Sequence, residues 1–141
     1  MSTTTKARVT LGKRPETFTA FVSALLPEGG EGTIEVTYRY RTRKEFGELL
    51  DQRMAQAEAA DAERQADLAA GKDVPALTAG DVQQSMVCAT VDHILEIATG
   101  WNLPEPFERE HVTQLADELP GLARAIIDRY REAIVEGRLG N

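Results

Sequence analysis

The feature that most constrains this fold is a strict alternation of apolar and polar residues over residues 33–41. Ile34, Val36, Tyr38 and Tyr40 share one face of the extended segment, while threonine, glutamate and arginine occupy the other. A period of two residues is typical of a β-strand with one buried face. Such a strand needs a partner strand and an apolar layer that covers its buried face.

A second segment of strand character precedes this one. Residues 17–26 are rich in β-branched and aromatic residues, and three glycines between Pro27 and Thr33 favour a turn, because glycine tolerates positive φ angles. The two segments predict a β-hairpin over residues 17–41. An isolated hairpin is marginally stable in water, so we expect helices or a third strand beside it. Residues 7–11 are the candidate for that third strand.

From Thr42 onwards the periodicity is helical. Thr42 and Glu45 fit a capping box, and a short apolar stripe then extends to Met54. Residues 55–70 are mostly alanine and charged residues, which favour a helix but give it little to pack against. We therefore predict a helix over residues 43–70 whose alanine-rich end is a projecting arm or a frayed segment.

Residues 79–137 are predicted to form a helical region. Its first helix starts at Thr78 or Asp81, carries a broad apolar face and ends at Gly100, so we expect it at the centre of the fold. A connector with two prolines follows, and proline fixes the backbone φ angle and stiffens such a segment.

Two short amphipathic helices complete the chain. Pro120 and Gly121 separate them, and Gly137 and Gly140 end the second, at the position where glycine is favoured after a helix. Residues 1–141 are thus predicted to be a single domain of the α+β class, mainly α, with an N-terminal β-hairpin followed by about four helices.

Charge and composition narrow the classes of partner. The 141 residues carry a net charge of −7, and an acidic excess opposes nonspecific binding to nucleic acid. No apolar run approaches the roughly 18 residues of a membrane span, and residues 1–10 lack the apolar core of a secretory signal. We expect a soluble protein of the cytoplasm with no membrane partner and no nucleic-acid partner.

The residues that usually carry chemistry are few. His93 and His111 are far apart in the sequence and are expected to be packed or rim residues. Cys88, the single cysteine, has apolar neighbours and no adjacent base, so we expect a buried, inert thiol. No catalytic residue, metal ligand set or cofactor motif is predicted, and an enzyme is not expected.

One basic run could contact nucleic acid. It consists of Arg39, Arg41, Arg43 and Lys44. The alternative is that Arg39 and Arg41 lie on the solvent face of an edge strand, where basic residues commonly block pairing between sheet edges.

The C-terminal residues contain several motifs in a fixed order: a tryptophan at the end of one helix, a proline-rich connector, a leucine-rich helix, a Pro-Gly step and a last helix with a tyrosine. The residues concerned are Trp101, Leu103, Pro106, Phe107, Leu115, Pro120, Gly121, Tyr130, Gly140 and Asn141. In their order and spacing these motifs resemble the C-terminal pattern of phage tail assembly chaperones. The junction around residues 14–18 and 38–46 resembles one branch of the same family. Glu108 departs from the pattern, since members often place a better helix cap there.

The resemblance implies a function. Members coat the long, largely helical tape-measure protein, keep it soluble and help to recruit tail-tube subunits in the host bacterial cytoplasm. It therefore implies a non-enzymatic chaperone whose partners are the tape-measure protein, the tail-tube protein and further copies of itself.

Candidate partner-binding residues lie in and after the connector. Trp101, Pro104, Phe107 and Tyr130 are the candidates, because large aromatic side chains beside short connectors often anchor interfaces. The alternative is that the aromatic residues pack the core of the domain itself.

Two other functions remain open at this point. The first is a structural phage subunit of the tail-completion or connector type, which would be present in finished virions. The second is a small nucleic-acid-binding regulator that would use the basic run, and its binding would weaken steeply with salt.

Overall fold

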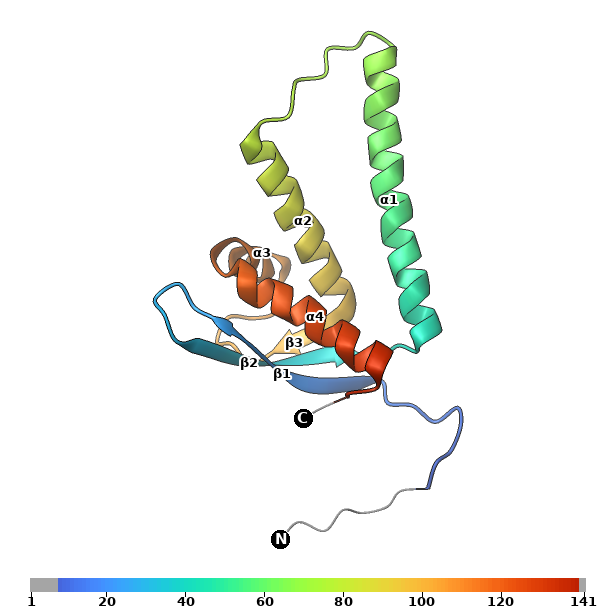
Figure 1. Cartoon of the computed structure of the whole chain (residues 1–141), viewed down its shortest axis with the longest axis vertical. Coiled ribbons are helices and arrows are strands. Elements are labelled where there is room, and N and C mark those ends of the chain that lie inside the picture. Colours follow the sequence, from blue (N-terminus) through green and yellow to red (C-terminus); the bar gives the residue numbers. More distant parts are fainter. Residues whose placement is uncertain (1–7, 140–141) are drawn as a thin grey trace.

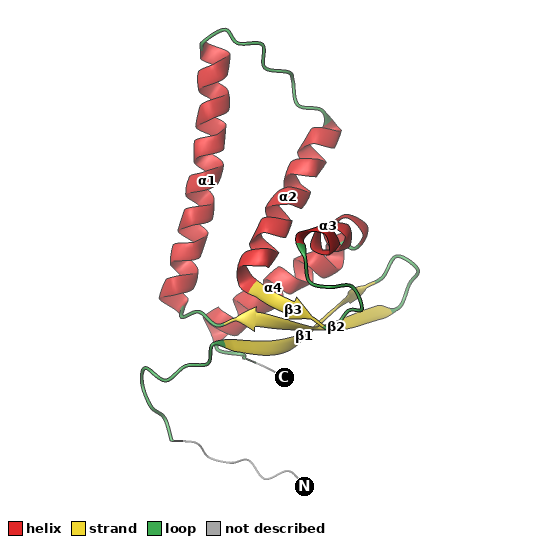
Figure 2. Cartoon of the chain, turned by 180° about the vertical axis from the view of Figure 1, so that it is seen from behind, coloured by secondary structure: helices red, strands yellow, loops and turns green. Residues whose placement is uncertain are grey.

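The computed structural model describes residues 8–139. In chain order the elements are β1 (Thr17–Leu25), β2 (Glu31–Arg39), α1 (Arg43–Ala69), α2 (Ala79–Ile97), β3 (Ala98–Trp101), α3 (Arg109–Glu118) and α4 (Pro120–Glu136). The strands form one layer, α3 and α4 lie on one side of it, and α1 and α2 project away on that same side (Figures 1 and 2). The described residues confirm the predicted α+β, mainly α fold with a hairpin followed by four helices.

The hairpin forms as predicted. β1 and β2 pair in antiparallel register along their whole lengths, with Val22 opposite Ile34. Gly29 and Gly30 turn the chain with φ angles of 89° and 78°, which side chains would resist. The alternating pattern of β2 is confirmed, because Ile34, Val36 and Tyr38 are buried. Tyr40 lies beyond the strand and is half-buried.

The third strand is β3, so the prediction of a strand at residues 7–11 was wrong. β3 follows α2 directly and pairs with β2. Asn102 extends this pairing, since its N–H donates to the Glu35 carbonyl at 3.1 Å and its Oδ1 accepts from the Glu35 N–H at 2.9 Å. Residues 8–11 form no strand, and Ala7 lies outside the described residues. Four residues are too few to show an alternation next to a helical pattern.

A second correction follows from the position of β3. β2 is the central strand, so Arg39 does not protect a sheet edge. Arg41 lies beyond the end of β2 and turns inward, where its guanidinium donates to the Tyr130 hydroxyl at 3.1 Å. The expectation that both arginines face solvent from an edge strand was therefore wrong.

The two long helices begin where the sequence predicts. Thr42 and Glu45 form a capping box, and so do Thr78 and Asp81. α1 continues as an unbroken helix to Ala69, and its outer half extends away from the sheet (Figure 1). α2 is central only in its last turns, because its buried residues start at Val91 and its first turns are exposed.

The C-terminal helices meet at a sharp break. Leu119, with φ −129° and ψ 63°, ends α3 and precedes the proline that opens α4. Glu108 is the N-cap of α3 and makes no side-chain capping bond, as expected for a poor cap. Gly137 ends α4 in the left-handed conformation at φ 72°, whereas Gly140 lies outside the described residues.

An aromatic cluster joins the sheet to α4 and α1. The Tyr130 ring lies 5.3 Å from that of Tyr38, 6.1 Å from that of Phe18 and 5.7 Å from that of Phe46, between ring centroids. Such pairs contribute about 0.5–1.5 kcal/mol each beyond the apolar area that they bury. The cluster therefore fixes α4 and the base of α1 on the hairpin.

The two buried tyrosine hydroxyls are satisfied. Tyr38 donates to the Ile126 carbonyl at 2.7 Å, and Tyr130 donates to the Arg39 carbonyl at 2.9 Å. Burial raises the pKa of both hydroxyls above the usual value, so both stay neutral. Both bonds therefore tie α4 to the end of the central strand β2.

Candidate functional site

A groove of about 660 Å³ lies between α1, α2 and the corner of α3 and α4. Its apolar lining comes from all four helices: Phe46 and Leu50 on α1, Met86 and Val87 on α2, Ala116 on α3, and Ala123 and Ile127 on α4. A concave surface of this kind, with apolar side chains from several helices, accommodates one face of an amphipathic helix.

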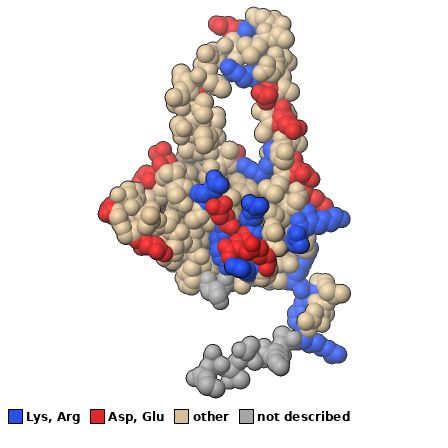
Figure 3. All heavy atoms as spheres, in the orientation of Figure 1, with Lys and Arg blue, Asp and Glu red and all other residues tan. Residues whose placement is uncertain are grey.

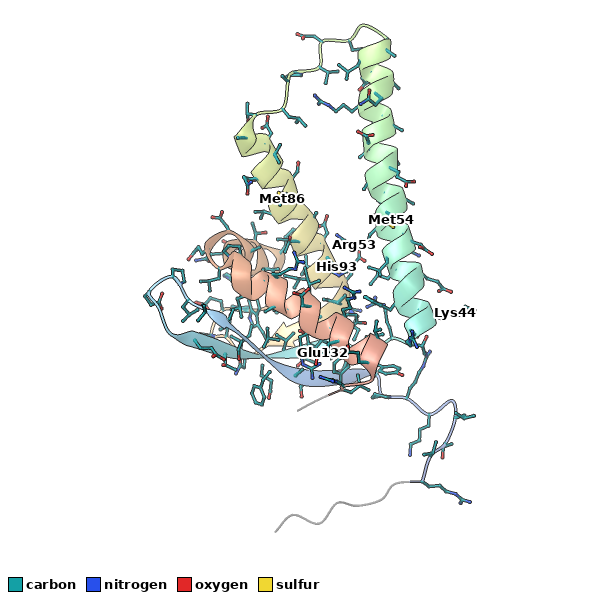
Figure 4. All side chains as sticks on the ribbon, in the orientation of Figure 1. Lys44, Arg53, Met54, Met86, His93 and Glu132 are labelled. Atoms are coloured by element: carbon teal, nitrogen blue, oxygen red, sulfur yellow. The ribbon has the colours of Figure 1, made fainter. Side chains whose placement is uncertain are left out.

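Exposed apolar side chains extend the groove walls outward from the sheet. Leu50 is 38% exposed and Met86 is 58% exposed, although both line the groove. Met54 and Val82 lie one helical turn further out on the same helix faces, because residues four apart share a face. Figure 4 labels Met54 on α1 and Met86 on α2. Methionine is flexible and polarisable, so it suits a surface that adapts to different ligands.

The outer parts of α1 and α2 stand apart. A space-filling view shows an open window between them, closed at its far end by residues 70–78 (Figure 3). Near the base, Arg53 of α1 donates to the Ala89 carbonyl of α2 at 2.7 Å and lies 3.5 Å from the Glu96 carboxylate. From Met54 outward every α1 side chain is exposed except the half-buried Arg64 and Asp67. The outer side chains of α1 are therefore not part of the core of the protein and are accessible from solvent.

The groove rim carries charges of both signs. Arg124 and Arg131 lie on it together with Asp117 and Asp128, and the Arg124 guanidinium is 3.3 Å from the Asp128 carboxylate. This pair is highly exposed, so it contributes little to stability but remains available to a partner. The rim can therefore pair with the polar face of a bound helix whichever charge that face carries.

His93 lies at the floor of the groove. Its side chain is only 8% exposed, and its Nδ1 makes no hydrogen bond within the described residues. Burial, with smaller contributions from the positive charges of Arg53 and Arg41, lowers the pKa of His93 to about 4. The imidazole is therefore neutral near pH 7 and offers one unused polar atom in an apolar setting.

A comparison with models of known protein families gave one match. The model described as phage tail assembly chaperone matches residues 4–141, almost the whole length. The chain belongs to that family. Searches of curated proteins and of solved structures gave no match. Membership of the chaperone family supports a role in tail assembly through binding to tail proteins, and it points to a non-enzymatic role.

The structure separates the candidate anchors of this chaperone. Trp101 and Phe107 are half-buried and pack edge-to-face with ring centroids 5.1 Å apart. Trp101 also lines a hollow of about 210 Å³ on the side of α3 away from the groove. Trp101 Nε1 donates to the Glu105 carbonyl at 2.6 Å, and Pro104 is exposed. Tyr130 is fully buried in the aromatic cluster, which is the alternative role that we gave it.

The basic run of the chaperone is only partly exposed. Arg39 is exposed at the end of β2, and Arg43 and Lys44 are exposed in the first turn of α1. Lys44 is labelled at the base of α1 in Figure 4. Arg41 is half-buried, and its guanidinium donates to the Tyr130 hydroxyl instead.

Sequence reasoning missed the groove. Leu50, Met54 and Met86 were assigned to apolar stripes that would be buried, whereas all three are exposed and Leu50 and Met86 line the groove. One signal in the sequence could have indicated the groove. Residues 55–70 contain too few apolar residues to cover the apolar stripe that ends at Met54. Cys88 was expected to be buried and is exposed, because the first turns of α2 project with the arm.

Neither a metal-binding cluster nor a membrane-spanning helix is found among the described residues. Between residues 8 and 139, no three histidine, cysteine, aspartate or glutamate side chains come together in a way that would hold a metal ion. No helix in that same range is long and apolar enough to cross a membrane.

Proposed function

We propose that this protein is a tail assembly chaperone that binds the tape-measure protein of a long-tailed phage in the groove between α1, α2 and α4. The observation that supports the proposal most directly is the apolar groove itself, whose lining includes the exposed side chains of Leu50 and Met86. Exposed apolar side chains that cluster in a concave surface are typical of a protein-binding site.

The chemistry of the groove favours a helical client. The apolar floor can take one face of an amphipathic helix, and the mixed charges of the rim can meet its polar face. A tape-measure protein, as the resemblance implies, is long and largely helical, so its apolar stripes would aggregate without cover. The net charge of −7 would keep the complex dispersed in the host cytoplasm while the tail assembles.

A second contact is proposed at the hollow beside Trp101. Its lining includes Leu103 and Leu119, and Pro104 projects from the adjacent connector. Because this hollow lies apart from the groove, it could take the tail-tube protein while the groove holds the tape-measure helix. Trp101, Pro104 and Phe107 would then serve this second partner.

The test of the groove is coexpression with the cognate tape-measure protein. Met86→Glu places a charge among apolar groove residues, and we expect it to weaken the complex roughly tenfold to a hundredfold, with precipitation of the client. Leu11→Glu is the matched control, because Leu11 is 94% exposed and far from the groove, and it should leave binding unchanged. Pro104→Glu should retain the tape-measure protein and weaken binding to the tail-tube protein.

Three results would contradict the proposal. One is a tape-measure protein that is equally soluble without this chain. Another is equal loss of binding in Leu11→Glu and Met86→Glu, since the groove would then have no special part. The third is recovery of the chain as a stoichiometric component of purified virions, which would favour a structural subunit of the tail.

A further inference from the structure

The hollow beside Trp101 has the size of a single side chain. Its volume is about 210 Å³, against about 660 Å³ for the groove. Pockets that hold small-molecule ligands usually measure about 300–1,000 Å³. The hollow is therefore too small for a helix, and it fits one long side chain that projects from a partner.

The walls of the hollow are mostly apolar. Their apolar residues are Trp101, Leu103, Leu115 and Leu119. Two contacts hold the indole of Trp101 in place: its Nε1 donates to the Glu105 carbonyl at 2.6 Å, and its ring packs edge-to-face against Phe107. Tryptophan is the side chain that attracts cations most strongly across its ring face. A fixed indole with leucines beside it therefore suits a side chain with an aliphatic stem and a cationic end.

The charged residues of the hollow are all acidic. Glu105 and Glu118 line it, and none of the lysines and arginines between residues 8 and 139 does so. Residues 102–119 contain five acidic residues and one basic residue, Arg109, whose guanidinium lies 2.8 Å from the Asp92 carboxylate. Such an excess of one charge favours a partner that carries the opposite charge at this place.

Glu118 lies at a position that is unfavourable for an anion in the free chain. It is the last residue of α3, and the last turn of that helix contains no basic residue. The C-terminal end of a helix carries a partial negative charge, so a carboxylate there is repelled and a cation is stabilised. This placement points to a bound cation independently of the composition of the lining.

Building on the second contact proposed above, we propose that the hollow binds an arginine side chain of the second partner. The aliphatic part of this arginine contacts Trp101 and the three leucines, and its guanidinium lies against the carboxylates of Glu105 and Glu118. Arginine suits the site better than lysine, because a planar guanidinium stacks on an indole and can pair with a carboxylate through two N–H groups. The bound cation also compensates the negative end of α3.

The test uses Trp101 as a reporter. It is the only tryptophan of the chain, so a chain labelled with fluorotryptophan gives one fluorine NMR signal, and that signal comes from the hollow. The probes are N-acetylarginine amide and the corresponding citrulline compound, which has nearly the same shape but no charge. We expect both to shift the signal, with a dissociation constant about fivefold lower for the arginine probe. Added salt should reduce this difference.

Glu118→Gln removes one carboxylate and should raise the dissociation constant of the arginine probe about threefold. It should not lower the free energy of unfolding, because it relieves a negative charge at the end of α3. Adding Glu105→Gln should abolish the preference for the arginine probe over the citrulline probe. Asp117→Asn is the matched control, since Asp117 is exposed and adjacent to Glu118 on α3 but lines the groove. It should leave the dissociation constants of both probes unchanged.

Two results would overturn the proposal. One is equal affinity for the arginine and citrulline probes, and the other is an equal effect of Asp117→Asn and Glu118→Gln on the arginine probe. The second partner is tested separately, with the cognate tail-tube protein. If the arginine probe binds with the expected preference but the tail-tube protein does not bind, the chemistry of the hollow is supported and only the second contact of the proposed function fails.

Discussion

The base and the arm of this molecule are built on different principles. In the base, formed by the sheet, α3, α4 and the last turns of α2, apolar side chains interlock around the ring of Tyr130. In the arm, formed by residues 54–90, nearly every side chain is exposed. Polar bonds join its parts: Arg53, just before the arm, donates to the Ala89 carbonyl, and Arg64 donates to the Pro75 carbonyl. Stability therefore resides in the base.

The difference teaches how a small protein can offer apolar surface without collapsing onto it. If α1 and α2 packed against each other, Leu50 and Met86 would be covered and the groove would close. The alanine-rich sequence of the arm prevents this, because alanine maintains a helix but offers little apolar area for packing. The base can carry such an arm because its own core does not depend on it.

The largest expected effect concerns the base. Tyr130→Ala removes the ring at the centre of the aromatic cluster and the hydroxyl that bonds to Arg39 and Arg41. We expect the free energy of unfolding to fall by about 3–5 kcal/mol, as for other large aromatic truncations in a core. Urea denaturation, followed by circular dichroism, measures this change.

Leu68→Ala is the comparison variant in the arm. Leu68 is 46% exposed near the end of α1, so its truncation should change the free energy of unfolding by less than about 0.5 kcal/mol. Similar losses for Tyr130→Ala and Leu68→Ala would show that the arm is part of one cooperative core, and the distinction between the two regions would be wrong.

The next largest effect is a pH dependence of the free energy of unfolding. It tests whether His93 of α2 belongs to the buried base. The pKa of His93 is lowered from 6.5 to about 4 by burial and by two arginines, so between these values the unfolded chain binds a proton that the folded chain does not. Stability should therefore fall as the pH drops from 6.5 to 4, by roughly 3 kcal/mol. The measurement is urea denaturation at a series of pH values.

His93→Gln supplies the control, because it removes this titration and should flatten the decline between pH 6.5 and 4. Glu45 and Asp81, whose pKa values are lowered chiefly by the capping bonds to Thr42 and Thr78, lose their contribution at lower pH in both proteins. If the free energy of unfolding fell with pH as steeply in His93→Gln as in the natural sequence, His93 would be in contact with solvent, like the arm, and would not belong to the buried base.

The sequence predicted the central strand and several helix boundaries well because local rules suffice for them. The alternation in β2, the capping residues Thr42 and Thr78 and the Pro120 break each depend on neighbours in the chain, and each is confirmed. β3 was missed because its pairing with β2 joins segments about sixty residues apart, and four residues carry no period of their own.

The groove was harder to predict because an apolar stripe does not reveal whether another helix covers it. Leu50 and Met86 satisfy the same periodicity as buried residues, and the splay of α1 from α2 arises from the absence of apolar residues further along the arm. Likewise, tyrosine is a residue type that is common in interfaces, but the ring contacts of Tyr130 with Phe18 and Phe46 show that it is a core residue.

The smallest expected effect isolates the arm itself. Ala59 lies in the exposed part of α1, and Ala59→Gly should weaken the helix locally by about 1 kcal/mol. Because this part of α1 buries little apolar surface, hydrogen exchange of nearby amides should accelerate about fivefold while global unfolding changes by less than about 0.5 kcal/mol.

Ala133→Gly in α4 is the matched substitution in the base, where Ala133 is 1% exposed. The same change of residue should there lower the free energy of global unfolding by about 1 kcal/mol or more, because the helix cannot loosen without opening the core. Equal global losses at both positions would mean that α1 unfolds only with the base. In that case the groove walls would be rigid, and a client would have to fit the groove as it stands instead of separating α1 from α2.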